Sequence, residues 1–388
     1  MEHILYWLWL TGLYGTASGK LLPLIEHFGS IESVYKSTTY PSLGMYSERL
    51  LQKMNNKSLV WAEKIYNTCI KKNISIIAYD DDRYPGALKN IFVPPVVLYT
   101  KGQIPDWDNL LMISIVGTRK ATEYGLRITT SLCSELATKG VTLISGVATG
   151  IDSKAIESAV NTGAYSIMIS PCGLDVNYPK SNEKLRTKVI NFGLMISEYP
   201  PGMDVKTWHF KARNRIIAGI SKGTLIVEAP GKSGALITAR CALEENRDVF
   251  VVPGQIDNNN SLGVNNLLKD GAKPVFSAED ILSEYSHYIK FIKPVKIQKA
   301  QPEITDNESF FDAKPDKQKK QNSQFAQITQ TGVEGEILKY LTENGECHID
   351  TIMRELDTTA NAFQTAVFLL ELTGTITRLP GNILKRVK

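Results

Sequence analysis

Basic and aromatic side chains gather in one short segment of this 388-residue chain, FKARNRIIAGIS. The segment supplies Phe210, Lys211, Arg213, Asn214 and Arg215. Lys211 and Arg215 are four residues apart, so they would share one face of a helix. Guanidinium groups bind phosphates through paired hydrogen bonds, and aromatic rings stack on unpaired bases without demanding a sequence. The chemistry predicted here is phosphate and base binding.

The elements around this segment form a βαβ unit. Thr224 to Val227 and Val249 to Val252 have the apolar character of strands, and Ser233 to Asn246 has helical spacing. GKSG, with Lys232, follows the first of these strands. In parallel sheets ligands bind beyond the carboxyl ends of the strands, where helix amino termini present free N–H groups. We therefore expect an anionic ligand beside Lys232.

A second loop, IVGTRKATEYG, follows the strand that begins at Met112. Gly117 permits a tight turn and Thr118 can cap a helix. Arg119 and Lys120 then stand at the mouth of the sheet. We therefore interpret this loop, at the end of another strand, as a second source of cations for the same pocket.

A third loop, ISGVATGIDSKA, ends the next strand. Ser145 and Gly146, with Gly150, would let the backbone approach a ligand closely. Asp152 is placed to cap the helix that follows. These glycine-rich turns resemble nucleotide-binding loops, but neither matches the G-x-G-x-x-G pattern of dinucleotide sites.

Several catalytic patterns fail. GKS at Gly231 would suit an ATP-binding P-loop only with a glycine five residues earlier, where the chain has Ile226. The sequence contains no nucleophile elbow, paired catalytic carboxylates or clustered metal ligands. Glu228 and Asp175 are the acids nearest the predicted strand ends, and capping explains both as well as catalysis does. We expect a binding protein without cofactor or metal.

Regular alternation of strands and helices predicts an α/β fold with a Rossmann-like, doubly wound, mostly parallel sheet. Its strands are expected near residues 112–116, 141–144, 164–170, 193–197, 223–227 and 248–252. Residues 74–101 look like an extension of the same sheet.

Four regions are predicted along the chain. Residues 1–70 form a helical domain of the sterile-alpha-motif or helix-hairpin-helix kind, whose glycine-rich turn would either pack or offer amides to a DNA phosphate. Residues 74–285 form the sheet core, and the polar, lysine-rich stretch 286–328 reads as a flexible linker. Residues 329–388 show three helices and a hairpin, the pattern of a winged helix. The third of these helices contains no Arg or Lys, which disfavours the reading of DNA by this helix and favours a contact with protein at least as much.

Composition narrows the class of protein. The net charge is +4, which by itself identifies no partner. Five scattered cysteines without a CxxC pair are read as reduced thiols in a cytoplasmic protein. No apolar run approaches the ~18 residues of a membrane span, and no leader pattern begins the chain. A membrane role is not expected.

The motifs IVGTRKATEYG, SGVATGID, GLDVNYPKSNEKL, SEYPPG, FKARNRIIAGIS, KSGALITA and DVFVVPG occur in this order over roughly residues 75–284. Together they closely resemble the DNA-processing protein A family, also called DprA or Smf. One departure is Ile156, where that family commonly has histidine, and ISPCGLD replaces a more glycine-rich loop.

The resemblance implies a non-enzymatic protein that binds incoming single-stranded DNA during natural transformation, shields it and loads the RecA recombinase. It also implies a homodimer formed through the Rossmann-like core. The family's DNA pocket matches Arg119, Phe210, Arg213 and Arg215 in this chain. The alternative interpretation of the cations is that Arg213 or Arg215 makes an internal ion pair.

Two other functions stay open. EAPGKSGALIT is distantly similar to the PGG-x-GT loop of nucleotide phosphoribohydrolases of the lysine-decarboxylase-like group, with Ala239 where their glutamate might be expected. The second open function is that of an adaptor protein that acts through the winged helix alone.

Overall fold

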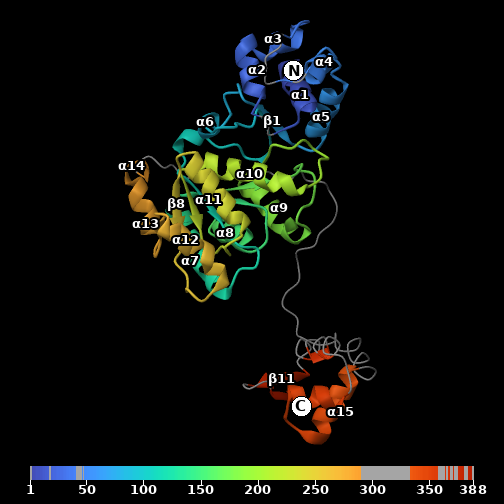
Figure 1. The fold of residues 1–388 in the computed structure, drawn as a ribbon, viewed down its shortest axis with the longest axis vertical. Coiled ribbons are helices and arrows are strands. Elements are labelled where there is room, and N and C mark those ends of the chain that lie inside the picture. Colours follow the sequence, from blue (N-terminus) through green and yellow to red (C-terminus); the bar gives the residue numbers. More distant parts are fainter. Residues whose placement is uncertain are drawn as a thin grey trace, which may run out of the picture. The chain divides into compact units, whose positions relative to one another are not determined.

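The structure is a computed structural model, and the residues it describes are 2–16, 19–40, 46, 48–289, 333–356, 363, 366–367, 370, 375–379 and 383–386. The chain divides into two compact units, Met1–Pro302 and Glu303–Lys388 (Figure 1). The first residues of the predicted linker, 286–289, form a short helix instead, and from residue 290 onward the linker lies outside the described residues.

The amino-terminal region is helical, as its sequence predicts. Its helices are α1 (Glu2–Tyr14), α2 (Leu21–Phe28), α3 (Ile31–Lys36), α4 (Glu48–Met54) and α5 (Val60–Lys71). Trp7, Leu8 and Leu10 of α1 are fully buried among them. The same apolar cluster continues into the sheet core through Val97, so these helices share a core with the first strands.

A nine-stranded sheet forms the centre of the first unit, with the order β1-β2-β6-β5-β4-β3-β7-β8-β9. Its strands are β1 (Ser75–Ala78), β2 (Val97–Gly102), β3 (Met112–Val116), β4 (Thr142–Gly146), β5 (Ser166–Ser170), β6 (Leu194–Ser197), β7 (Gly223–Ile226), β8 (Asp248–Val251) and β9 (Lys273–Pro274). From β6 to β9 all neighbours are parallel, while β1 and β2 extend the sheet antiparallel. The predicted mostly parallel α/β fold is confirmed.

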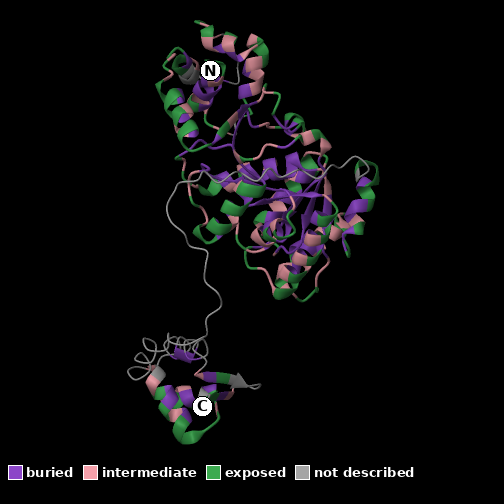
Figure 2. Ribbon diagram, turned by 180° about the vertical axis from the view of Figure 1, so that it is seen from behind, coloured by how far each residue is buried: buried purple, intermediate pink, exposed green. Residues whose placement is uncertain are grey.

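Helices cover both faces of the sheet, which is why its central strands are almost wholly buried (Figure 2). One face packs against α10 (Thr207–Ile220), α11 (Gly234–Glu244) and α12 (Leu262–Lys269). The other face packs against α7 (Glu123–Thr138), α8 (Ile151–Asn161) and α13 (Glu279–Leu282). The remaining helices of this unit are α6 (Gly86–Lys89), α9 (Glu183–Phe192) and α14 (Ser286–Ile289), with single 3-10 turns η1 (Trp107–Asn109), η2 (Lys180–Asn182), η3 (Asn259–Ser261) and η4 (Ser283–Tyr285).

Strand order reverses at β3, which pairs with β4 on one side and with β7 on the other. A buried hydroxyl pair, Ser114 and Thr224 at 2.7 Å, joins β3 to β7 at this junction. Because the loops after β3 and β7 leave the sheet in opposite directions, a crevice opens between them at the carboxyl edge. The fold therefore places the GTRK and PGKSG loops on opposite sides of one opening.

The second unit contains α15 (Val333–Asn344), β10 (Cys347–His348), α16 (Ile349–Glu355), β11 (Ile376–Leu379) and β12 (Ile383–Arg386). β12 pairs antiparallel with both β10 and β11. Ile337, Ile352, Phe363 and Leu384 are buried together. Two helices and the hairpin agree with the winged-helix prediction, while most of the predicted third helix lies outside the described residues. In neither unit is a described helix long and apolar enough to cross a membrane.

Candidate nucleic-acid interface

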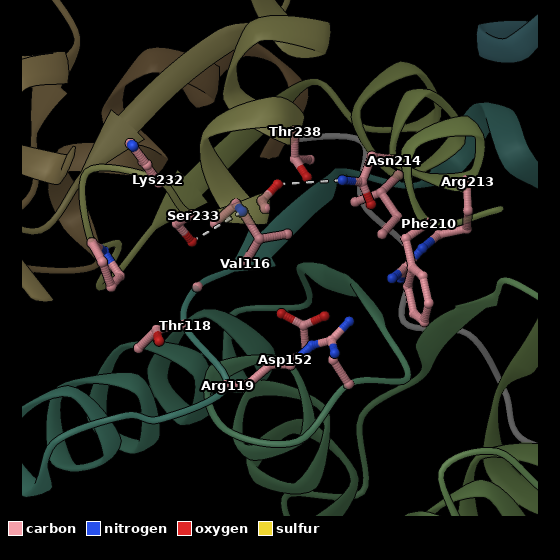
Figure 3. Close-up of a pocket in the computed structure, with 16 residues that line it drawn as sticks. Val116, Thr118, Arg119, Asp152, Phe210, Arg213, Asn214, Lys232, Ser233 and Thr238 are labelled. Carbon is pink, nitrogen blue, oxygen red and sulfur yellow. Dashed lines mark hydrogen bonds between the residues drawn. The ribbon is translucent and has the colours of Figure 1, made fainter. Parts of the chain in front are cut away.

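A cavity of about 310 Å³ opens at the point where the strand order reverses. Figure 3 shows Thr118, Arg119 and Asp152 on one side of it and Lys232, Ser233 and Thr238 on the other. The remaining wall comes from α10, and the lining includes seven of the predicted site residues: Gly117, Thr118, Arg119, Phe210, Arg213, Asn214 and Lys232. The fold thus brings cations from three separate segments to one opening.

Arg119 lies over the ring of Phe210, with its guanidinium carbon 4.9 Å from the ring centroid. The ring of Tyr178 meets Phe210 edge-on at 5.9 Å. Phe210 is half-buried and Arg119 is exposed. An exposed cation over a ring contributes only about 0.5–1 kcal/mol, so an incoming base can displace Arg119 at little cost. Arg119 is then free to contact phosphate.

Arg213 is the buried cation of the site, with only 4% of its surface exposed. Its Nη1 donates to the carbonyl oxygen of Ile169 at 3.2 Å, and its Nε has no partner within the described residues. Burial lowers the pKa of Arg213, although a guanidinium stays charged at neutral pH. Among the described residues no carboxylate reaches it within ion-pair distance. The nearby charge of Asp152 opposes the lowering of this pKa, so the positive charge of Arg213 is offset only in part and can still attract an anion in the cavity.

Asp152 is the acid of the cavity, and it is buried. Burial raises the pKa of Asp152 to about 6, opposed by the charge of Arg213 and by the backbone N–H groups of Gly117 and Gly146. The absence of a side chain at Gly146 lets the two charged groups come close together, since a Cβ there would clash with both Nη1 of Arg213 and Oδ2 of Asp152. Asp152 therefore sets the local field instead of binding an anion.

The prediction that Asp152 caps the next helix is wrong. α8 begins after Gly150, which is the N-cap residue and makes no side-chain capping bond. Gly150 has φ 82°, and a Cβ there would clash with the carbonyl oxygen of Thr118. Thr118 caps no helix either, because α7 is capped by Thr122, whose hydroxyl accepts from Gly125 N–H.

The PGKSG loop supplies the other side of the cavity. Ser233 caps α11 by accepting from the N–H of Ala235 at 3.2 Å. Asn214 donates to the carbonyl oxygen of Gly234 at 3.4 Å, which ties α10 to this loop. The exposed ammonium group of Lys232 therefore stands beside a helix amino terminus, where an anion is favoured.

Five predicted site residues lie elsewhere. Ser145 is fully buried and its hydroxyl donates to the carbonyl oxygen of Ile115 at 2.6 Å. Gly146 does not line the cavity but leaves the space that the guanidinium of Arg213 occupies. Lys211 is exposed and does not line the cavity either. Lys120 turns to a neighbouring depression that Arg119 also lines.

The fifth of these residues, Arg215, is held by an internal ion pair. Its Nη2 lies 2.6 Å from Oε1 of Glu198, and the two side chains are 12% and 3% exposed. Arg215 also donates to the carbonyl oxygen of Ala212. Of the two interpretations that the sequence left open, the structure therefore favours the internal ion pair for Arg215 and the cavity for Arg213.

Neither acid considered for catalysis enters the cavity. The carboxylate of Glu228 accepts from the N–H of Thr122 at 2.9 Å and from its hydroxyl at 2.5 Å. Gly125 leaves room for it, since a Cβ there would clash with that carboxylate. Asp175 pairs with Lys72 of the helical region at 2.7 Å. Both acids hold the structure together.

Arg186 is a residue that sequence reasoning missed. It is 6% exposed, and its guanidinium donates to three carbonyl oxygens, those of Leu174, Val176 and Tyr178. This clamp fixes the loop that presents Tyr178 to Phe210. In the sequence it is one more cation of a polar helix, α9, and no local pattern distinguishes it.

Comparison with known proteins identifies the family. Residues 75–286 match the family described as DNA recombination-mediator protein A. The chain belongs to this family. Residues 321–382 match its DprA winged helix domain.

Curated members of the recombination-mediator protein A family are similar over much of their length. Protein Smf of Synechocystis is 35% identical over 291 residues, which are 72% of this chain and 71% of that protein. DNA processing protein DprA of Streptococcus pneumoniae is 40% identical over 205 residues, 53% of this chain and 72% of that protein.

Two solved structures of the family agree in fold. DNA processing protein A from Streptococcus pneumoniae has a TM-score of 0.59 at 32% identity, covering 73% of this chain and 98% of that one. The protein from Helicobacter pylori, whose structure is described as giving insight into a unique single-stranded DNA binding mode, has a TM-score of 0.51 at 32% identity. That match covers 55% of this chain and 96% of the other.

Proposed function

We propose that this protein binds single-stranded DNA in the cavity between the GTRK and PGKSG loops and delivers the strand to the RecA recombinase. The observation that carries the proposal is Arg213, a buried cation that aims at the cavity with no carboxylate in ion-pair reach among the described residues. A phosphate would supply its missing partner, with Arg119 and Lys232 as further cations at the rim.

Single strands suit the site better than duplex. Phe210 is half-buried in the cavity wall, so only an unpaired base turned out of a stack can reach its ring. Stacking of a base on an aromatic side chain is worth about 1–3 kcal/mol and tolerates every sequence. The described single-strand binding of the Helicobacter relative supports this choice.

The proposed role is binding without chemical conversion of the DNA. Asp152 is the one carboxylate among the cavity-lining residues, and Glu228 is already engaged by Thr122. Paired acids or a nucleophile with a base are what nucleotide hydrolysis requires. The phosphoribohydrolase alternative is therefore not favoured by these residues.

The wider role is proposed from the family. The protein would act in the cytoplasm during natural transformation, shield incoming single strands and load RecA onto them as a homodimer. Three large apolar side chains support self-association through the core: Leu243 of α11, Leu262 of α12 and Phe276 after β9 are at least half exposed. They come from elements near one end of the sheet.

A binding titration tests the site through Phe210. Phe210→Ala should weaken binding of labelled single-stranded oligonucleotide by about thirtyfold, which corresponds to the middle of the stacking range. The dependence of affinity on salt should stay unchanged, because the ring neutralises no phosphate. Phe210→Trp should retain affinity, and Phe92→Ala, at a ring that is 91% exposed outside the cavity, is the matched control.

Two results would overturn the proposal. One is duplex DNA that binds as tightly as single strand. The other is a Phe210→Ala protein whose affinity equals that of the Phe92→Ala control. For delivery to RecA, filament assembly on strands precoated with single-strand-binding protein should accelerate when this protein is added, and no acceleration would limit the role to strand binding.

A further inference from the structure

A second depression lies beside the GTRK loop, which also lines the cavity. Its volume is about 540 Å³, and it is walled by the GTRK loop, by α8 and by the start of α9. Arg119 lines both the cavity and this depression. The two hollows are therefore neighbours that share one cation.

Cations dominate the depression, which we call the lysine groove: Arg119, Lys120, Lys154, Lys184 and Lys188 line it. Glu157 is the one acid in its lining, and it pairs with Lys154 at 3.1 Å. None of the other four cations makes an ion pair within the described part of the chain. The groove carries about four uncompensated positive charges, if every carboxylate and ammonium is counted at full charge.

The placement of two lysines costs stability in the free protein. Lys184 and Lys188 are four residues apart on α9, so both ammonium groups lie on one face of that helix. Like charges at this spacing destabilise a helix by a few tenths of a kcal/mol. An anion in the groove would offset that repulsion.

The chemistry of the lining tells which part of a nucleic acid it suits. Ser153, Ser181 and Asn182 add hydrogen-bonding groups to the cations, and none of the described residues that line the groove is aromatic. The cavity, in contrast, has Phe210. Phosphate oxygens match the groove, whereas bases match the cavity.

We propose that a strand bound in the cavity continues over Arg119 into the lysine groove, which grips the phosphodiester backbone of the nucleotides beyond it. The inference rests on the proposed function and adds to it a second subsite, formed by Lys184 and Lys188 with Lys120. The protein's grip on DNA then depends on strand length, because a short oligonucleotide fills the cavity alone.

The test compares oligonucleotides of about 4 and about 20 nucleotides, which span the usual size range of single-strand sites. The double variant Lys184→Ala/Lys188→Ala removes two exposed ammonium groups that lie outside the cavity. Its matched control is Lys139→Ala/Lys269→Ala, which removes two exposed lysines that line neither hollow.

For the longer strand, the slope of log K against log salt should fall by about 1.4 in the groove variant, or about 0.7 for each phosphate that the protein no longer neutralises. Affinity for the shorter strand should equal that of the unaltered protein, as should both affinities of the control. An unchanged slope on the longer strand would overturn the groove, and so would an equal loss of affinity on both lengths.

The experiments can refute the lysine groove and the proposed DNA binding in the cavity separately. If Phe210→Ala weakens binding while the lysine variant keeps its slope, the proposed function stands and the groove does not. If the unaltered protein binds no single strand of either length, the proposed function itself fails.

Discussion

Arg119→Ala is the most informative single change, because Arg119 lines both hollows and its contact with Phe210 in the free protein can be accounted for separately. There the guanidinium covers Phe210, which contributes about 0.5–1 kcal/mol. In the complex we expect it to make a charge-assisted hydrogen bond to phosphate, worth about 1.5–3 kcal/mol. The difference is the net loss of binding free energy on substitution, about 1–2 kcal/mol, or roughly fivefold to thirtyfold in affinity.

Fluorescence anisotropy with a labelled single strand measures both the affinity and its salt dependence. The slope of log K against log salt should fall by about 0.7, the value for one phosphate on a single strand. Arg127→Ala is the matched control, since Arg127 is also exposed and also lies over a ring, that of Tyr124. It lines neither hollow and should leave affinity and slope unchanged.

Two results would refute this reasoning. An Arg119→Ala protein with unaltered slope would mean that Arg119 touches no phosphate. An equal loss of affinity in Arg127→Ala would mean that the effect is one of net charge, acting at long range, and not of the cavity.

Two further changes separate structure from binding. Arg215→Ala should lower the free energy of unfolding by about 3 kcal/mol, because Glu198 loses its buried ion-pair partner; denaturant titration measures this loss. The salt dependence of DNA binding, measured by anisotropy, should stay the same. Asp152→Asn tests the buried acid: its folded pKa of about 6 exceeds the unfolded value of 3.8, so the folded protein binds the extra proton between these values. Measured against Asp152→Asn, the free energy of unfolding of the unaltered protein should rise by roughly 2.5 kcal/mol as pH falls from 7 to 4, because the slope approaches about 1.4 kcal/mol for each pH unit only between the two pKa values. A flat difference would show that Asp152 is not desolvated.

The sheet could be predicted from sequence because its strands are buried on both faces and read as apolar runs. Met112–Val116 is fully buried, and so is Thr142–Gly146. β9 could not be predicted in this way, since it has two residues and one of them is proline. The start of α8 was misjudged because the rule for helix caps favours aspartate, whereas the chain there passes through Gly150 at positive φ, in close contact with Thr118.

Loops at strand ends identified the cavity, because the topology of parallel sheets brings such loops together. Which side chains pair with each other between separate elements could not be predicted from the sequence. Glu198 follows β6 and Arg215 lies in α10, and only their packing shows that this arginine is neutralised. The lysine groove was missed for a different reason: Lys184 and Lys188 look like any solvated helix face until the GTRK loop is placed beside them.

The buried charges at the cavity explain why this fold keeps an arrangement that weakens it. A guanidinium at 4% exposure with only one hydrogen bond to a carbonyl is costly, and the nearby acid is itself partly neutralised by burial. Gly146, which has no side chain, lets Arg213 and Asp152 approach from either side without a direct ion pair. Had Asp152 paired fully with Arg213, the cation would be satisfied and a phosphate would have to compete for it. Because the two groups stop short of an ion pair, Arg213 stays fixed and under-coordinated, so an incoming phosphate gains a hydrogen-bond partner without first breaking a strong ion pair.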